Sequence, residues 1–262
     1  MKEYIRLNIN YKVSLVLMFI DDYTSMPVKG SNIVPTLAEV IKKPIKKNDG
    51  CFVFTDICGE FFNLNIKSSH YFEENIKLDM KNLDIKEPIV YLRLKPSPNY
   101  PFNNEDTIVR LMLSNSKTKK ISAAKINAII TSPELSKVKI IQDKIEKGIN
   151  IPNFHSIAGI LTIGEELYIH DGKKEEYCRI NKIVDYENKL FELENPLKYQ
   201  HTRGVLLMPV VRTYTDFKGE TVIYFKAVGL KKIEFKLEIL HEEKNYQQQV
   251  TAEAGSTIKI TI

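Results

Sequence analysis

The residues best suited to bind a metal ion gather in one stretch of the sequence, between positions 155 and 201. This stretch contains histidines, carboxylates and a thiol: His155, His170, Asp171, Glu175, Glu176, Cys178 and His201. A zinc site needs three or four such ligands, and two of them commonly form a short pair such as His-x-His or Cys-x-x-Cys. The stretch contains no such pair. We therefore predict that His170-Asp171-Gly172 forms a turn, that Glu175 and Glu176 lie on a solvated strand edge, and that no metal is bound.

Asp21 and Asp22 are the acidic pair that directly follows the strongest apolar run. A hydrolase would need two carboxylates in one pocket, or a nucleophile with a base and an oxyanion hole. Neighbouring residues on a strand point to opposite faces, so these two cannot share a pocket without a bulge. The sequence also has no Gly-x-Ser-x-Gly, no His-Glu-x-x-His and no phosphate-binding Gly-rich loop. It predicts a strand that ends in a polar turn, and neither a catalytic residue nor a cofactor.

The aromatic residues suggest a second class of function, carbohydrate binding, because β-sandwiches often hold sugars on exposed aromatic platforms. The chain has 13 Tyr and 12 Phe but no Trp, which has the largest stacking face. Five tyrosines stand in predicted strands or joints: Tyr91, Tyr100, Tyr199, Tyr214 and Tyr246. Packing in cores and joints explains such positions better than sugar contacts do. A glycan is therefore the alternative partner.

Composition narrows the choice of partner further. The net charge is +5, from 38 basic and 33 acidic residues. The lysines are scattered and often stand beside glutamates, as in Lys173-Lys174-Glu175-Glu176. Because proteins that bind nucleic acid usually gather their basic residues in one patch or helix face, we predict no nucleic-acid partner.

The cysteines and the N-terminal region indicate the compartment. Cys51, Cys58 and Cys178 are odd in number and lack metal-ligand spacing, so they predict free thiols in a reducing compartment. The apolar run at residues 15–20 is too short to span a bilayer and lacks a cleavage site after it. We expect a buried strand there, no membrane insertion, and cytoplasmic synthesis and assembly, after which the protein can be part of a released particle.

Most of the chain shows the alternation of short strands. In residues 60–67, Phe62, Leu64 and Ile66 alternate with polar residues, which predicts one buried and one wet face. Residues 232–240 repeat this pattern with Ile233, Phe235, Leu237 and Ile239, and residues 257–262 do the same. Closely spaced turns at Asp49-Gly50, Asp171-Gly172 and Glu187-Asn188-Lys189 favour sandwiches or small barrels.

One stretch is typical of a helix. Ser132 is a suitable N-cap, Pro133 suits the first helical position, and Gly148 suits the end. Four apolar residues lie between them at roughly helical spacing: Leu135, Val138, Ile141 and Ile145. We expect a helix here, although residues 138–141 would also suit a strand.

An internal repeat is the most informative feature of the sequence. A turn and strand at residues 49–54, a strand at 60–67 and an aromatic turn at 70–72 come in that order. Near the C-terminus the same order returns at residues 217–225, at 232–240 and at Asn245-Tyr246. The repeat predicts two copies of one β-module.

These segments resemble a known family. The strand that ends in DDYTSMPVKG, the later NDGCFVF, and EFFNLNIKSSHYF are similar to the carboxypeptidase regulatory-like, or transthyretin-like, β-sandwich. The resemblance covers residues 12–94, and then residues 106–131 and 211–262 as a split second copy. LKPSPNYPFNNEDTIVRLML resembles the Pro-rich joint between such modules. The resemblance implies a fold and a scaffolding role, and no catalytic residue.

The segment between the two halves of the second copy has a pattern of its own, formed by Gly164, Glu165, Leu167, Ile169, Asp171, Gly172, Leu193, Pro196, Leu197 and His201. This pattern is similar to a small β-unit of phage-tail and other virion-like proteins.

The sequence thus predicts an all-β protein with tandem transthyretin-like β-sandwiches and a small β-domain inserted in the second. We expect a first sandwich at 1–95, a joint at 96–105, a split second sandwich at 106–132 and 206–262, and an inserted domain at 133–205. The expected function is a non-enzymatic structural or adaptor component of a multi-protein assembly, such as a phage-tail-like particle or contractile injection system. Other subunits would be its partners, and carbohydrate or surface binding is the alternative.

Overall fold

The computed structural model describes residues 12–29, 33–115, 120–156, 161–185, 187, 190–226 and 229–262. The described residues form strands and two short 3₁₀ turns, without an α-helix, which confirms the all-β class. None of the described helical segments is long and apolar enough to cross a bilayer. The chain divides into two compact units, unit 1 (Met1–Leu94) and unit 2 (Lys95–Ile262).

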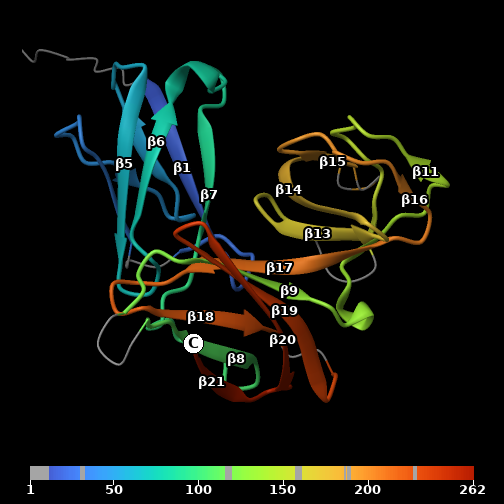
Figure 1. Ribbon diagram of the computed structural model, residues 1–262. Coiled ribbons are helices and arrows are strands. Elements are labelled where there is room, and N and C mark those ends of the chain that lie inside the picture. The colour runs from blue at the N-terminus through green and yellow to red at the C-terminus, as the bar shows by residue number, and fades with distance from the viewer. Residues whose placement is uncertain are drawn as a thin grey trace, which may run out of the picture. The chain divides into compact units, whose positions relative to one another are not determined.

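Unit 1 contains two sheets that fit a β-sandwich (Figure 1). One sheet has the order β3-β4-β1-β7 and the other has the order β2-β5-β6. Strands β1 and β7 run parallel, and the other neighbours run antiparallel. The elements are β1 (Val13–Asp21), β2 (Ile33–Leu37), β3 (Ile45–Lys46), β4 (Phe52–Thr55), β5 (Phe61–Ser68), β6 (Glu74–Asp79), the turn η1 (Met80–Asn82) and β7 (Ile89–Leu94).

The predicted alternation positions the core of unit 1. Phe62, Leu64 and Ile66 of β5 are at most 3% exposed, as expected for residues two apart on the inner face of a strand. The run at residues 15–20 forms most of β1, where Leu15 and Leu17 are fully buried. Both strand predictions are confirmed.

Unit 2 begins and ends with strands in the same arrangement. One sheet has the order β18-β8-β21, with β8 and β21 parallel, and β9, β19 and β20 are consecutive neighbours in the other. The order β4-β1-β7 facing β2-β5-β6 in unit 1 thus recurs, strand for strand. The elements are β8 (Thr107–Met112), β9 (Lys125–Ile130), β18 (Glu220–Phe225), β19 (Lys232–His241), β20 (Lys244–Glu253) and β21 (Thr257–Thr261).

Two glycines show how closely these sets of strands correspond. Gly50 and Gly219 precede the equivalent strands β4 and β18, with φ of +94° and +74°. A Cβ atom at either position would lie 2.5 Å from a backbone carbonyl oxygen, of Val28 or of Leu113. Each turn therefore needs glycine both for its positive φ and for the close approach of the backbone.

Between β9 and β18, unit 2 carries further elements that have no counterpart in the described part of unit 1. They are the turn η2 (Pro133–Leu135), β10 (Val138–Lys139), β11 (Lys144–Ile145), β12 (His155–Ser156), β13 (Glu166–Asp171), β14 (Lys174–Asp185), β15 (Leu190–Leu193), β16 (His201–Thr202) and β17 (Leu206–Tyr214). Strand β17 pairs with β13 through residues 207–209 and with β9 through residues 210–214. It therefore joins these strands and the β9-β19-β20 strands into one sheet.

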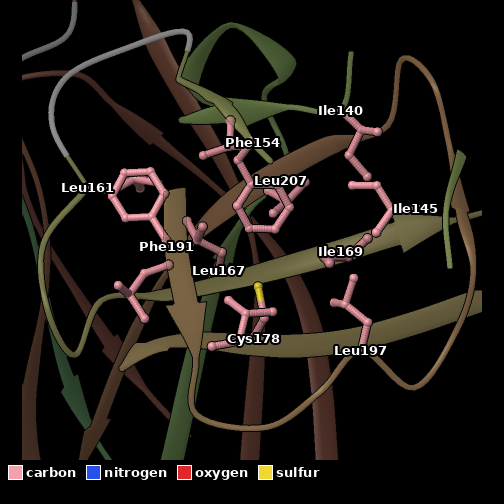
Figure 2. Packing of buried hydrophobic residues seen from close by; sticks show 13 residues of the cluster. Ile140, Ile145, Phe154, Leu161, Leu167, Ile169, Cys178, Phe191, Leu197 and Leu207 are labelled. Atoms are coloured by element: carbon pink, nitrogen blue, oxygen red, sulfur yellow. The ribbon is translucent and has the colours of Figure 1, made fainter. Parts of the chain in front are cut away.

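The extra strands have a core of their own (Figure 2). The apolar side chains converge between β13, β14, β15 and β17. Cys178 points into this cluster, and burial raises the pKa of its thiol. The cluster consists of Val138, Ile140, Ile145, Phe154, Leu161, Leu167, Ile169, Cys178, Ile180, Phe191, Leu193, Leu197 and Leu207.

The helix predicted at residues 132–148 is wrong. Ser132 does not cap the segment with its side chain but accepts a hydrogen bond from the Glu234 amide, at 3.1 Å. After the turn η2, Val138 and Ile140 are fully buried while Ile141 is 44% exposed. The period of two prevails because β10 pairs with both β12 and β17, which fixes an extended backbone.

The turns agree with the prediction in part. Gly172, with φ of +64°, closes the β13–β14 hairpin as expected. The aromatic turn expected at Asn245-Tyr246 is wrong, since both residues lie in β20 and the turn is made by Glu242 and Glu243. Asn188 and Lys189, predicted to close a hairpin, lie outside the described residues.

Candidate functional site

Among the described residues, a large polar cluster lies on the outward face of the sheet that contains β17, β9, β19 and β20 in unit 2. Arg212 of β17 stands opposite Asn127 of β9, and Asn127 stands opposite Glu238 of β19. Glu238 in turn stands opposite Gln247 of β20. Because directly opposed residues share a face, these four side chains form one transverse row across four adjacent strands.

Glu238 is the centre of this row. Its Oε2 atom accepts hydrogen bonds from the hydroxyl of Tyr177, at 2.6 Å, and from the side-chain amide of Asn127, at 3.4 Å. Its Oε1 atom lies 2.8 Å from Nζ of Lys236 and accepts from the Gln247 amide at 3.2 Å. We call Glu238 with these four donors the Glu238 network.

The electrostatics of the network follow from these contacts. Burial by itself would raise the pKa of Glu238, but the hydrogen bonds from Lys236, Tyr177 and Asn127 outweigh it and lower the pKa below its ordinary value. Burial and the Glu238 carboxylate both raise the pKa of the Tyr177 hydroxyl. At neutral pH the pair is therefore a phenol that donates to a carboxylate, which is a strong hydrogen bond.

Tyr177 and Arg212 connect the network to a depression in the surface. The Arg212 guanidinium carbon lies 4.9 Å from the centre of the Tyr177 ring, and its Nε atom lies 2.8 Å from Oε2 of Glu166. The depression has a volume of about 340 Å³ and is lined by Glu166, Tyr177, Cys178, Arg179, Glu194, Asn195 and Arg212. Its two arginines face two glutamates, since Arg179 lies 3.6 Å from Glu194. The charges that line it are thus paired with one another.

A second polar cluster is buried beside the core of the extra strands. His201 of β16 is fully buried, and its Nε2 atom lies 2.7 Å from Oε1 of Glu176. Its Nδ1 atom lies 3.3 Å from Oδ2 of Asp171. Glu176 also accepts hydrogen bonds from the backbone amides of Lys198 and Tyr199, at 2.8 and 3.2 Å. The cluster ties β14 to residues 198–201, and Glu176 is buried rather than on a solvated edge as predicted.

The candidate metal ligands are only partly brought together. His201, Asp171 and Glu176 meet, but the two carboxylates contact opposite nitrogens of the imidazole ring and cannot converge on one ion with it. His170 instead pairs with Glu175 at the surface, at 3.2 Å. The side chain of His155 lies outside the described residues. Within the described part of the chain, no group of three or more His, Cys, Asp or Glu residues is arranged to hold a metal.

Asp21 and Asp22 diverge, as strand geometry requires. Asp21 accepts from the amides of Tyr23 and Thr24, at 2.8 and 3.1 Å, and from the Tyr71 hydroxyl at 2.8 Å. Asp22 lies 2.6 Å from Nε of Arg93. These contacts fit the polar turn that the sequence predicts at the end of β1.

Sequence reasoning did not find the Glu238 network. Its members come from positions 127, 177, 236, 238 and 247, and no local motif links them. The available signals were weak: Glu238 belongs to the outward row of its strand, and Arg212 interrupts an apolar run. Only the pairing and packing of distant strands bring them together.

Comparisons with known proteins define no family for this chain. No family model and no curated protein matches the sequence. The TIE protein of Bacillus anthracis matches 95% of this chain and 50% of its own length, at 8% identity and a TM-score of 0.24. The full-length major pilin SpaD of Corynebacterium diphtheriae matches 95% of this chain and 69% of its own, at 10% identity and a TM-score of 0.22. TM-scores this low do not establish a shared fold, so the resemblances to transthyretin-like modules and phage-tail units stay predictions.

Proposed function

We propose that this chain is a non-enzymatic structural or adaptor component of a multi-protein assembly. The observation that carries the proposal is the recurrence of one strand order in both units, β4-β1-β7 with β2-β5-β6 and β18-β8-β21 with β9-β19-β20. Repeated β-modules with cores of their own are rigid spacers that present sheet edges and loops to partners. In this proposal the modules are tandem transthyretin-like sandwiches, and residues 133–205 form a small domain inserted in the second.

The polar clusters support a structural role. Tyr177 of β14 donates to Glu238 of β19, so the Glu238 network links the extra strands to the β9-β19-β20 strands. His201 and Glu176 link β16 to β14 in the same manner. A hydrogen bond to a charged group contributes about 1.5–3 kcal/mol, so the first contact holds the extra strands against β19 and the second holds β16 against β14.

The kind of assembly is suggested by the template that residues 164–201 resemble. We take a phage-tail-like particle or a contractile injection system, assembled in the cytoplasm, as the instance to test first. Gly164 and Gly172 of that template both adopt positive φ, of 77° and 64°, as tight turns require.

The test is affinity purification of the tagged, full chain from its native host, with mass spectrometry of the proteins recovered with it. A matched sample uses the His201→Ala variant, in which we expect the extra strands to be destabilised. Recovery of the same partner subunits in fixed ratios, reduced with the variant, supports the assembly role. Recovery of the chain alone at native expression would contradict it.

One observation favours a second candidate, carbohydrate or surface binding. Of the five tyrosines considered for sugar contact, Tyr91, Tyr199 and Tyr246 are 43–44% exposed. An exposed phenol ring offers an amphipathic face to a sugar. Binding to a glycan array that Tyr199→Ala or Tyr246→Ala weakens would support this function, and a uniformly negative array would remove it.

A further inference from the structure

The outer edge of β20 differs in its chemistry from the equivalent edge of unit 1. Within the described residues, β20 pairs only with β19, over ten regular positions without a bulge. Residues 245–252 carry no charge and no proline. Native edges are usually protected from further pairing by charges, prolines or bulges. The equivalent edge of unit 1, β6, follows this rule with Glu74, Lys77 and Asp79.

The sandwich is also incompletely covered on this side. Ile258 and Ile260 of β21 stand opposite Val109 and Leu111, which are at most 1% exposed, so they share the inner face. Both isoleucines are nevertheless half-buried only. Strand β21 follows β20 after the short link 254–256, and each is the outermost strand of its sheet (Figure 1).

The inner row of β20 is open in the same way. Tyr246 stands opposite Ile239, which is 6% exposed, and therefore belongs to the inner face. Tyr246 itself is 44% exposed, and Gln248, two residues further on, is exposed as well. A strand added beside β20 would satisfy its free backbone groups and cover this inner row.

We propose that this edge binds residues 4–11 of a second copy of this chain as an added β-strand. The inference rests on the proposed assembly function and names one partner for it. In residues 4–11, which lie outside the described part of the chain, Ile5, Leu7, Ile9 and Tyr11 alternate with Arg6, Asn8 and Asn10. Such alternation is typical of a strand that buries one face.

The two surfaces match in length and polarity. Eight extended residues span roughly 26 Å, which is comparable to the ten-residue strand β20. The apolar row of the segment would cover Ile258 and Ile260, and its polar row would continue the neutral outer row of Asn245, Gln247 and Gln249. The backbone supplies the affinity and the alternating side chains supply the specificity, as in other cases of strand addition.

This pairing joins different surfaces of the two copies. We call residues 4–11 the arm. A contact between the arm of one copy and the β20 edge of another is heterologous, so each copy still has a free arm or a free β20 edge after one contact forms. The geometry therefore predicts head-to-tail chains whose length increases with protein concentration.

The test uses two full-length variants that each block one partner surface. Leu7→Lys/Ile9→Lys places charges in the apolar row of the arm, and Gln248→Lys places an inward charge on the exposed edge of β20. The matched controls Asn8→Lys/Asn10→Lys and Asn245→Lys add the same number of charges to the outward rows. Self-association is measured by analytical ultracentrifugation.

We expect each blocking variant to weaken self-association by about tenfold or more, and the controls to behave like the wild type. An equimolar mixture of the two blocking variants should form a 1:1 heterodimer that grows no further, because it retains one intact arm and one intact edge.

Other results overturn the proposal. A wild-type chain that stays monomeric at every concentration excludes exchange between copies. A mixture that forms no heterodimer, while only Gln248→Lys abolishes association, indicates direct pairing of two β20 edges instead. If the chain is monomeric but is recovered with partner subunits in fixed ratios, this inference fails and the proposed function stands.

Discussion

Unit 1 and the equivalent strands of unit 2 share one strand order but differ in the residues of their edge strands. In unit 1, β2 is an edge strand in the described part of the sheet, and Pro35 at its centre lacks the N–H that a further strand would need. The equivalent strand β9 has no proline, and β17 pairs with it over residues 210–214. The same strand order can therefore end at an edge strand or continue into a larger sheet, depending on the residues of that edge strand.

The edge strands on the opposite side, β6 and β20, differ in a similar way. Strand β6 carries three charges among six residues, whereas β20 carries charges only at its two ends, Lys244 and Glu253. Pro35 and the charges of β6 therefore protect these two edges of unit 1, whereas in unit 2 the β9 edge is extended by β17 and the outer β20 edge is unpaired among the described residues. The predictions below test whether this difference governs stability as well as assembly.

The largest effect is expected from the buried cluster of His201, Glu176 and Asp171 in unit 2. His201→Ala removes a hydrogen-bond partner of the buried Glu176 carboxylate, and leaving a buried charge without its partner costs about 3–5 kcal/mol. We expect hydrogen exchange to accelerate in residues 161–205 and to stay unchanged in unit 1. The control is His170→Ala, whose exposed pair with Glu175 contributes less than about 1 kcal/mol. Equal effects of the two variants would contradict this role.

The cores of unit 1 and of the equivalent strands of unit 2 should respond alike. Leu64 of β5 and Leu237 of β19 are fully buried on equivalent strands. Leu64→Ala and Leu237→Ala should each lower the free energy of unfolding by about 2–5 kcal/mol. Urea unfolding followed by hydrogen exchange locates each loss, which we expect in the unit that carries the substitution. Loss of protection in both units with either variant would show that the two cores unfold together.

The smallest effect is expected from the Glu238 network. Glu238→Gln should cost about 1–2 kcal/mol at neutral pH, because an amide cannot accept all the hydrogen bonds of the carboxylate. The lowered pKa of Glu238 means that its contribution is complete above the ordinary value of 4.5 and is lost as the pH falls through the lowered value.

The free energy of unfolding, measured between about pH 6 and about pH 2, should therefore fall more steeply with decreasing pH in the wild type than in the Glu238→Gln variant. Glu234→Gln, an exposed carboxylate in the outward row of the same strand, is the matched control. An unchanged pH profile in Glu238→Gln would remove the network from the account of stability.

Local patterns predicted the strands and several turns well. The alternation at residues 60–67 and 232–240 identified β5, β19 and their buried rows, because side chains on a strand alternate between its two faces regardless of which strand lies beside it. The Asp-Gly turns were found for a similar reason, since positive φ is a property of the residue itself. The recurrence of turn and strands also pointed to two related sets of strands.

Local patterns failed where two conformations were nearly equal in propensity or where distant strands decide the outcome. Residues 138–141 suit a helix or a strand, and the pairing of β10 with β12 and β17 selected the strand. The Glu238 network was hidden because its members are up to 120 positions apart, from Asn127 to Gln247, and meet through the register of β9, β19 and β20 and the contact that Tyr177 of β14 makes with β19.

The sequence by itself therefore determined the all-β class, the inward rows of β5 and β19 and the Asp-Gly turns, because each depends on a few consecutive residues. Only the tertiary structure decided that β17 extends the β9 edge, that Tyr177 reaches Glu238, and that His201 lies between two carboxylates. The physical reason is that strand pairing is a choice among distant partners, and hydrogen bonds that complete it are formed between residues that no local pattern relates.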